Sequence, residues 1–356
     1  MAVTAAALVA VPALSVAGPS LVYVSPSGSA TNDDSSCAQA TQTSIQTAVD
    51  TVSNGGTVIV CAGTYAEQVD VTKQLTLQGQ SAVIDATGKA YGIGLGADYV
   101  TVRGMTVENA TSDENSGAPG DGIVTASLVG GPPTSSNFAT ITGNILRNNG
   151  GAGIDLQSTH GAIVASNSTS HNGIGINISN DLGGPSRSNR VVGNLSNDNG
   201  FCGIVMADHT GSGIFGNAIL GNVANRNGAQ GGAGILMATP TPNGSVRNNT
   251  IRGNQMVGNG HAGLEVHVHV TGADFSGNTV VGNTIGTNNL KGDYKDPKRT
   301  GIYVGSRSPL KLTVDRNVIY ANYYGVFTAG KVTLRAWSNG FSHVTKHYGH
   351  VTTYAG

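Results

Sequence analysis

Short runs in which apolar and polar residues alternate recur along the chain. In the clearest run, Gly263–Val270, every second residue from Leu264 is aliphatic, and the residues between are Glu265, His267 and His269. Alternation with a period of two predicts a β-strand with one buried side and one side toward solvent. The opening of this run, a glycine and then an aliphatic residue, recurs at Gly122, Gly153, Gly175, Gly203, Gly234, Gly301 and Gly325. A fixed motif at roughly 22- to 38-residue intervals indicates a repeat architecture.

Pairs of asparagines five residues apart precede these strands. The pairs are Asn144 and Asn149, Asn167 and Asn172, Asn194 and Asn199, Asn222 and Asn227, Asn254 and Asn259, Asn283 and Asn288, and Asn317 and Asn322. Asparagine and glycine tolerate left-handed backbone conformations, so the pairs predict turns at fixed places in each repeat. Repeats stacked about 4.8 Å apart would let equivalent amides hydrogen-bond in ladders.

Short strands joined by such turns predict a parallel β-helix. Its inward column is expected to consist of Ile154, Ile176, Ile204, Ile235, Leu264, Ile302 and Val326. Ahead of the coils, residues 43–54 carry aliphatic residues at helical spacing and end at two glycines, which predicts a short helix that caps the first coil. We expect the coils to span 57–334 and residues 335–356 to form a C-terminal tail.

These features resemble the right-handed parallel β-helix proteins of the pectate-lyase-like superfamily. The resemblance rests on the capping helix, on Gly-Thr-Tyr at Gly63–Tyr65 and on the repeated Gly-Asn, Asn-Gly and Gly-Ile pattern, and it covers roughly Leu21 to Leu334. It implies an all-β fold, a single-stranded right-handed parallel β-helix (solenoid) that forms one domain over residues 18–356. Members include polysaccharide lyases, glycoside hydrolases, epimerases, phage tailspikes and adhesins, so the fold does not select a function. The catalytic motifs of polygalacturonases and of one pectate lyase branch are not present as sets, and no catalytic residue is carried over from them.

The composition limits the possible partners of the protein and the compartments in which it is expected. The chain has 356 residues, of which 11% are charged, and a net charge of -1, so it lacks the basic footprint of a nucleic-acid-binding protein. The apolar run in residues 4–14 is followed by small residues, which predicts a signal peptide at 1–17 that is too short to span a bilayer. Cys37 and Cys61 are expected to pair, and Cys202 is left over and buried. We therefore expect a secreted or surface protein, a monomer without a membrane span.

The repeats also serve as an internal alignment of candidate site residues. The second residue after each repeat glycine should point outward, which aligns Asp155, Asn177, Val205, Leu236, Glu265 and Tyr303. The fourth position aligns Gln157, Ser179, Ala207, Ala238, His267 and Gly305, and the sixth aligns Thr159, Asp181, His209, Pro240, His269 and Arg307. Ionisable residues on outward positions add nothing to folding, so their concentration on one sheet favours a functional surface.

The predicted chemistry is acid–base work on an acidic polysaccharide. We predict His209 as the base, Asp181 as its orienting partner, His269 as the acid and Arg307 as a clamp for a substrate carboxylate. Neutralising that carboxylate acidifies the neighbouring C–H bond, as β-elimination or epimerisation requires. The predicted substrate-binding residues are Asp155, Gln157, Glu265, His267, Tyr303, Lys298 and Arg299. The insertions at 109–121, 183–190 and 284–299 would decide whether this face is a groove.

The function that these residues favour is a secreted lyase or epimerase, with a polysaccharide or cell-surface glycan as partner. A non-catalytic surface or matrix-binding β-helix is the alternative, because aromatic residues that could stack on sugars are scarce and solvated histidines are ordinary on strands. A glycoside hydrolase that uses Asp155 and Asp181 is a further alternative. No cofactor is expected, and calcium is left open. A metal held by His267 and His269 is less favoured, because alternate residues of one strand are spaced widely for a single ion.

Overall fold

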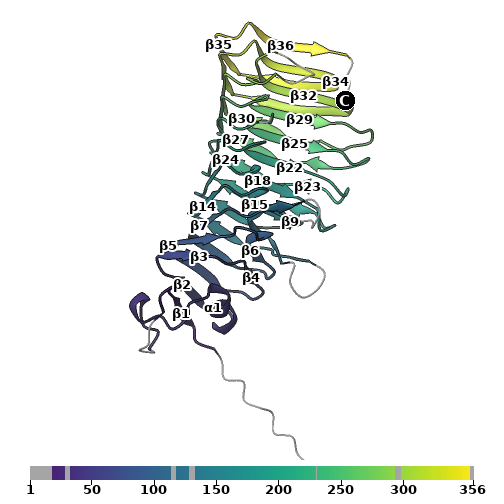
Figure 1. Ribbon diagram of the computed structural model, residues 1–356. Coiled ribbons are helices and arrows are strands. Elements are labelled where there is room, and N and C mark those ends of the chain that lie inside the picture. The colour runs from purple at the N-terminus through teal and green to yellow at the C-terminus, as the bar shows by residue number, and fades with distance from the viewer. Residues whose placement is uncertain are drawn as a thin grey trace, which may run out of the picture.

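The computed structural model describes residues 18–28, 33–113, 118–127, 133–229, 231–292 and 298–352. These residues wind into a right-handed parallel β-helix whose coils stack from the N-terminal end at the base of the molecule to the C-terminal end at its top (Figure 1). The predicted fold class is therefore confirmed. The predicted signal peptide lies outside the described residues.

Most full coils contribute one strand to each of three faces, and the strands within each face are parallel. The first face carries the repeated Gly-aliphatic strands, and its strands pair in consecutive register from β4 to β36. It contains β4 (Val69–Val71), β6 (Tyr91–Leu95), β10 (Asp121–Val124), β15 (Ala152–Gln157), β18 (Ile174–Ser179), β22 (Ile204–Ala207), β25 (Ile235–Thr239), β29 (Leu264–Val268), the first parts of β32 (Thr300–Asp315) and β34 (Tyr324–Trp337), and β36 (Lys346–Val351).

The second face consists of short strands together with parts of the long strands β5 (Thr76–Asp85), β7 (Thr101–Glu108), β32 and β34. It contains β1 (Leu21–Val24), β2 (Thr57–Val60), the first parts of β5 and β7, β13 (Thr140–Thr142), β16 (Ile163–Ala165), β20 (Arg190–Val192), β24 (Ala218–Leu220), β27 (Thr250–Arg252), β30 (Thr279–Val281), and the last parts of β32 and β34. These strands are also parallel and in register.

The third face closes the coil. It contains β3 (Gly63–Tyr65), the last parts of β5 and β7, β14 (Ile145–Arg147), β17 (Ser168–Ser170), β21 (Leu195–Asn197), β28 (Gln255–Val257), β31 (Thr284–Gly286), β33 (Val318–Tyr320) and β35 (Gly340–Ser342). Three small sheets lie outside these faces. Two are antiparallel pairs, β8 (Ser112–Asp113) with β9 (Ala118–Pro119) and β11 (Ala126–Ser127) with β12 (Thr134–Ser135), and the third is the parallel stack of β19 (Ser186–Arg187), β23 (Ile214–Phe215) and β26 (Val246–Arg247).

The interior follows the predicted repeat. Ile154, Ile176, Ile204, Ile235, Leu264, Ile302 and Val326 occupy consecutive rungs and are fully buried. The first residues of the asparagine pairs form a ladder in which each Nδ2 donates to the next Oδ1 over 2.9 to 3.0 Å. The second residues form a parallel ladder, and a third joins Asn217, Asn249 and Asn278. The ladders satisfy buried amides at every turn.

The asparagine ladder explains why each repeat has a glycine, because the ladder leaves no room for a side chain at that position. A Cβ on Gly153 would lie 2.9 Å from Nδ2 of Asn172 and 2.9 Å from the carbonyl oxygen of Gly175. A side chain at this position would therefore displace the ladder or the next rung, so the coil requires glycine where the sequence repeats it.

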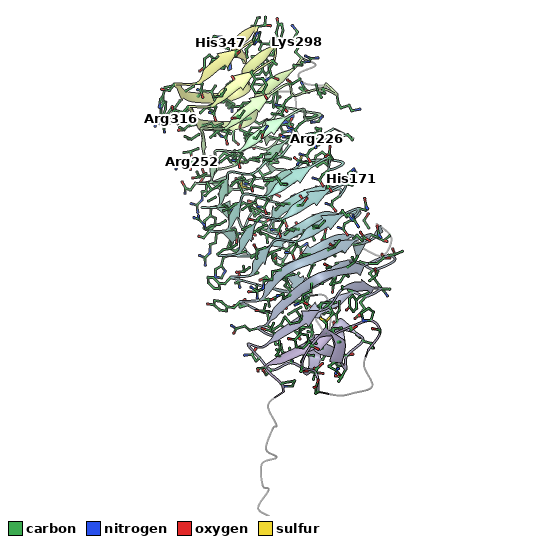
Figure 2. All side chains as sticks on the ribbon, turned by 90° about the vertical axis from the view of Figure 1, so that its left-hand side faces the viewer. His171, Arg226, Arg252, Lys298, Arg316 and His347 are labelled. Carbon is green, nitrogen blue, oxygen red and sulfur yellow. A yellow bond between two sulfur atoms is a disulfide. The ribbon has the colours of Figure 1, made fainter. Side chains whose placement is uncertain are left out.

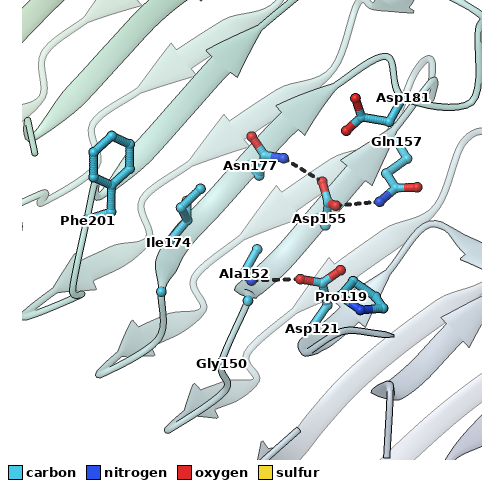
Figure 3. Close-up of a pocket in the computed structure, with 12 residues that line it drawn as sticks. Pro119, Asp121, Gly150, Ala152, Asp155, Gln157, Ile174, Asn177, Asp181 and Phe201 are labelled. Carbon is cyan, nitrogen blue, oxygen red and sulfur yellow. Dashed lines mark hydrogen bonds between the residues drawn. The ribbon is translucent and has the colours of Figure 1, made fainter. Parts of the chain in front are cut away.

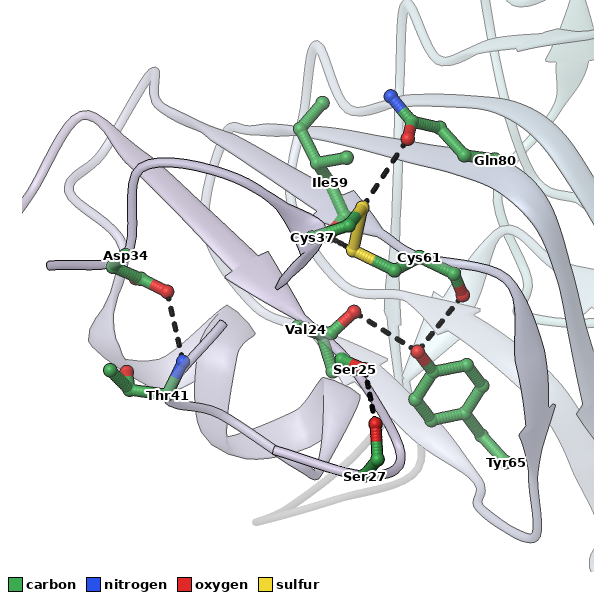
Figure 4. Close-up of a disulfide and its surroundings, with 10 residues drawn as sticks. All are labelled: Val24, Ser25, Ser27, Asp34, Cys37, Thr41, Ile59, Cys61, Tyr65 and Gln80. Carbon is green, nitrogen blue, oxygen red and sulfur yellow. Dashed lines mark hydrogen bonds between the residues drawn. A yellow bond between two sulfur atoms is a disulfide. The ribbon is translucent and has the colours of Figure 1, made fainter. Parts of the chain in front are cut away.

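The N-terminal cap is the helix α1 (Ile45–Thr51), with the 3₁₀ turn η1 (Cys37–Gln39) ahead of it. The helix buries Ile45, Ala48 and Val49 against the first coil. It is shorter than the predicted 43–54, because Ser44 is the N-cap and the backbone is already extended at Val52. Cys37 and Cys61 form the predicted disulfide beside the cap, and the Tyr65 hydroxyl donates to the backbone carbonyls of Val24 and Cys61 (Figure 4).

The C-terminal boundary of the coils was predicted too early. Strand β34 runs on to Trp337, and β35 and β36 add strands beyond residue 334. The reason is that Asn339 continues the first asparagine ladder by accepting from Asn317 over 2.9 Å. Much of the expected tail is therefore part of the coil.

Candidate functional site

The predicted alignment of outward residues on the first face is confirmed. Asp155, Asn177, Val205, Leu236, Glu265 and Tyr303 pair on consecutive rungs, and so do Gln157, Ser179, Ala207, Ala238, His267 and Gly305. The repeat in the sequence therefore places these residues next to one another in space.

The expectation that this column faces solvent is wrong. Asp155, Val205 and Glu265 are only 5%, 4% and 3% exposed, and Tyr303 is 2% exposed. Residues that precede the repeat glycines cover the column: Cys202 and Ala233 pack on Val205 and Leu236, and Ala262 packs with Tyr303. Ionisable groups in the column are consequently buried.

A cavity of about 400 Å³ opens on the first face around three aspartates (Figure 3). Asp121 begins β10, Asp155 lies in the middle of β15, and Asp181 follows β18. The described lining also includes Gln157, Asn177, Ile174 and Phe201, of which Phe201 is exposed. We call this hollow the acidic cavity, because its described lining contains carboxyl groups and no lysine or arginine.

Hydrogen bonds hold the two buried aspartates in fixed positions. Oδ1 of Asp155 accepts from Asn177 over 2.9 Å, and Oδ2 accepts from Gln157 over 2.6 Å. Oδ1 of Asp121 accepts from the backbone amide of Ala152 over 2.7 Å. Its other oxygen is buried and has no hydrogen-bond partner among the residues that the structure describes. Asp121 is therefore a poor place for a negative charge.

The three aspartates have different pKa values, because they differ in burial and in their charged neighbours. Burial raises the pKa of Asp121 to about 7. Burial, together with the charge of Asp121, raises the pKa of Asp155 well above its ordinary value. For Asp181 the burial effect is the largest single one, but its hydrogen bonds and the charge of His209 together outweigh it, so its pKa lies below the ordinary value. The cavity thus combines carboxyl groups that keep a proton with one that stays ionised.

The predicted pair of Asp181 and His209 is present. Nδ1 of His209 lies 2.7 Å from Oδ1 of Asp181, and this hydrogen bond raises the pKa of the imidazole. Both residues lie beyond the ends of their strands, and the bond from Asn180 to Asp208 stacks the two chain segments there. His209 does not line the cavity, so the geometry makes it a positioning partner of Asp181 rather than the base that we predicted.

A second group of ionisable residues lies further along the same column. Oε1 of Glu265 is 2.7 Å from Nε2 of His267, and Oε2 is 3.5 Å from Nδ1 of His261. The ring of His267 makes edge contacts with His269 and Tyr303 at centroid distances of 5.1 and 5.3 Å. Burial would raise the pKa of Glu265, but the charges of the two neighbouring histidines lower it to about 2. We call Glu265, His261, His267 and His269 the imidazole cluster.

The structure divides the single site that the sequence predicted. Asp155 and Glu265 are four rungs apart on the first face, which is roughly 19 Å. The predicted base His209 and acid His269 follow strands two rungs apart, so they do not share one substrate position. Lys298 lies over the ring of Tyr323, 4.0 Å from its centroid. Arg307 and Arg299 are exposed and, like Lys298, do not line the acidic cavity, so the predicted carboxylate clamp is absent from it.

Sequence reasoning missed Asp121, Phe201 and His261. All three precede a repeat glycine by one or two residues, and the alignment began at the glycine itself. Aligning the preceding residues would have placed Asp121 beside Ala152 and Ile174, which also line the cavity.

The fold and the three in-register faces define a right-handed parallel β-helix protein. Residues 31–245, more than half of the chain, match the family model "Periplasmic copper-binding protein (NosD)". The chain therefore belongs to the NosD family, which that description places in the periplasm. No helix among the described residues is long and apolar enough to cross a membrane.

Solved structures with the same architecture are distant in sequence. The A-module of mannuronan C-5 epimerase AlgE4 from Azotobacter vinelandii has 16% identity and a TM-score of 0.56, with 94% of this chain and 100% of that chain covered. The AlgE6 A-module from the same organism has 20% identity, a TM-score of 0.52 and coverages of 88% and 94%. PfbA, a surface adhesin of Streptococcus pneumoniae, has 14% identity, a TM-score of 0.58 and coverages of 92% and 91%. At these identities the likeness shows the fold alone. No curated protein matches the sequence.

Copper in the family description calls for a set of ligands. Within the described ranges, no three His, Cys, Asp or Glu side chains group in a way that could hold a metal ion. The described sulfur atoms are also poorly placed to bind copper. Met105, Met206, Met237 and Met256 lie in the core, and burial raises the pKa of the Cys202 thiol. The described residues thus do not fit a copper centre.

Proposed function

We propose that the acidic cavity is the catalytic centre of a glycan-active enzyme that hydrolyses a glycosidic bond. The observation that carries the proposal is the convergence of three carboxyl groups on one cavity with their pKa values shifted apart. Glycosidic bonds are broken by one carboxyl group that donates a proton and a second that is ionised.

The environments assign the two roles. Asp155 keeps its proton because it is buried beside Asp121, and it donates that proton to the departing glycosidic oxygen. Asp181 stays ionised because His209 binds it, and it acts on the other side of the bond that breaks, either on water or on the sugar carbon. Phe201 offers an exposed ring at the cavity for a sugar face. Where Asp181 attacks the sugar carbon, water then adds to that carbon, frees Asp181 and returns a proton to Asp155; where Asp181 acts on water, Asp181 takes the water proton, and proton exchange with solvent resets both carboxyl groups.

This proposal differs from the lyase or epimerase that the sequence favoured. Those reactions need a positively charged side chain beside the substrate carboxylate, and the described lining of the acidic cavity contains no lysine or arginine. The ionised Asp181 would also repel a uronate, and so would Asp121 where it loses its proton, so the cavity suits a neutral sugar unit. A disulfide beside the cap is consistent with an oxidising compartment, and we place the protein in the periplasm or outside the cell.

The experiment is a panel of neutral and acidic polysaccharides followed by two assays, one for new reducing ends and one for the ultraviolet absorbance of an unsaturated product. The proposal predicts reducing ends without ultraviolet absorbance. An unsaturated product would restore the lyase. Binding without a change in any polymer would make the protein a non-catalytic binding module.

A further inference from the structure

The second face ends in a row of exposed residues on the last part of β34. Lys331, Thr333, Arg335 and Trp337 alternate with Val332, Leu334 and Ala336, and the first set is exposed while the second packs against the core. Successive exposed residues of a strand lie about 6.7 Å apart, so the row is about 20 Å long. Trp337 is the single tryptophan of the chain and is 48% exposed. We call these four residues the basic row.

Residues on neighbouring strands extend the surface beside the basic row, and hollows lie between them. Thr333 pairs with Lys311, Arg335 with Thr313, and Trp337 with Asp315. Two hollows of about 200 and 210 Å³ share Ser276 and Lys311, and the second of them is also lined by Thr279 and Arg335. A third hollow, of about 550 Å³, follows along the same strands and is lined by Arg252 and Arg316. These two arginines project from one edge of the stack, and Arg226 and His171 from the other (Figure 2).

The positive charge of this surface is little compensated by the described residues. Of the nearby carboxylates, Asp274 lies 3.7 Å from Arg247, and Asp315 is buried and 2.9 Å from Arg316. Lys311, Lys331, Arg335 and Arg252 have no carboxylate within ion-pair distance in the described ranges. Like charges gathered in this way repel one another and do not help folding, so the surface is built for an anionic ligand.

We propose that the basic row and the grooves beside it bind an acidic polysaccharide. Trp337 would stack on the apolar face of a sugar ring, Lys331, Arg335 and Lys311 would pair with its carboxylates, and the threonine hydroxyls would bond to sugar hydroxyls. A nucleic acid fits less well, because single strands are bound on several aromatic rings in succession and the row has one. This surface is separate from the acidic cavity, so the inference does not depend on the proposed hydrolysis.

The single tryptophan makes the test direct. The emission of Trp337 in the full chain is measured during titration with oligogalacturonate, and the same oligomers with esterified carboxyl groups serve as the neutral probe. We expect a saturable change with the acidic oligomers that weakens as salt is added, and little change with the neutral ones. No saturable change, or an equal change with both probes, would overturn the proposal.

A matched pair of variants locates the site. Arg335→Gln removes a charge from the basic row, and Arg190→Gln removes one from the same outward column, five rungs away or about 24 Å. The first should weaken binding by about fivefold to tenfold and the second by less than about twofold, with melting temperatures close to that of the parent. Equal losses in the two variants would remove the site from this surface.

Two further outcomes are decisive. A single-stranded oligonucleotide that binds more tightly than oligogalacturonate at the same salt would replace the glycan by nucleic acid. A change in Trp337 emission with protein concentration alone would identify the surface as an interface between copies of the chain. Either result would contradict the proposal.

Discussion

Asp155 and Glu265 occupy the same position of the repeat, the second residue after the glycine, and the same outward column of the first face. Their exposures, 5% and 3%, are nearly equal. Their pKa values nevertheless move in opposite directions, well above the ordinary value for Asp155 and down to about 2 for Glu265. Burial alone would raise both, so the neighbours decide: another carboxyl group beside Asp155, and imidazoles beside Glu265. One repeat position thus yields a proton donor at one end of the column and a permanent carboxylate at the other.

The largest expected effect separates the two carboxyl groups by activity. Asp155→Asn should lower kcat on a cleaved glycan by about a thousandfold or more, because the proton donor is lost; the new amide oxygen can still accept from Asn177, and the Gln157 amide must turn to accept from the new NH2 group. Glu265→Gln, at the equivalent position, should leave kcat within about twofold. Steady-state kinetics on both variants check this, and a comparable loss in Glu265→Gln would move the centre to the imidazole cluster.

The next effect separates them by stability. Glu265→Gln should lower the free energy of unfolding by about 3 kcal/mol at neutral pH, because it removes the buried carboxylate that contacts the half-buried His261 and His267. Because the folded pKa of Glu265 is depressed from 4.5 to about 2, its contribution is present above about pH 4.5 and is lost as pH falls toward 2. Urea unfolding at several pH values should therefore show the deficit shrinking in acid. A deficit that is constant with pH would refute the assigned ion pair.

Asp121→Asn should act in the opposite direction. The folded pKa of Asp121 is raised from 3.8 to about 7, so the unfolded chain releases this proton first, and the group destabilises the fold increasingly between those pH values. The variant should therefore have a higher melting temperature than the parent at neutral pH and little advantage near pH 4. It should also lower the alkaline limit of activity, because the charge that raises the pKa of Asp155 is removed. A loss of stability at neutral pH would contradict this account of the acidic cavity.

The smallest effect concerns the exposed pair of His209 and Asp181. Because the pKa of His209 is raised and that of Asp181 is lowered, the pair stabilises the fold most between about pH 4 and 6.5 and stops doing so as either group loses its charge. Both side chains are about 40% exposed, so His209→Gln should cost less than about 1 kcal/mol in that window and almost nothing at pH 9. Thermal unfolding at about pH 5.5 and 9 measures the difference, and an equal cost at both pH values would mean that packing, not charge, is lost.

The fold was predictable because its rules are local and repeated. The contact that excludes a side chain at Gly153 and the amide ladder through Asn172 recur in most coils, so one chain contains several copies of the same evidence. The register of Asp155, Asn177 and Glu265 followed directly from that repeat.

The site was less predictable because it depends on departures from the repeat. Asp121 stands where later coils have Ala152, Ile174 and Cys202, and the repeat pattern does not indicate that an acidic residue at this position has a function. The burial of Glu265 depends on how the preceding turn packs over the column, which alternation cannot show. Trp337 was assigned to a tail, and only the continuation of β34 places it beside Arg335.

The central claim is that Asp155 is a protonated acid and Glu265 an ionised carboxylate in the same folded protein. Carbon-13 NMR of the side-chain carboxyl groups tests it most directly, with Asp155→Asn and Glu265→Gln spectra to assign the two signals. At about pH 6 the account predicts the chemical shift of a protonated carboxyl group for Asp155 and that of a carboxylate for Glu265. An Asp155 signal that titrates near the ordinary value of 3.8, or a Glu265 signal that titrates near 4.5, would contradict it.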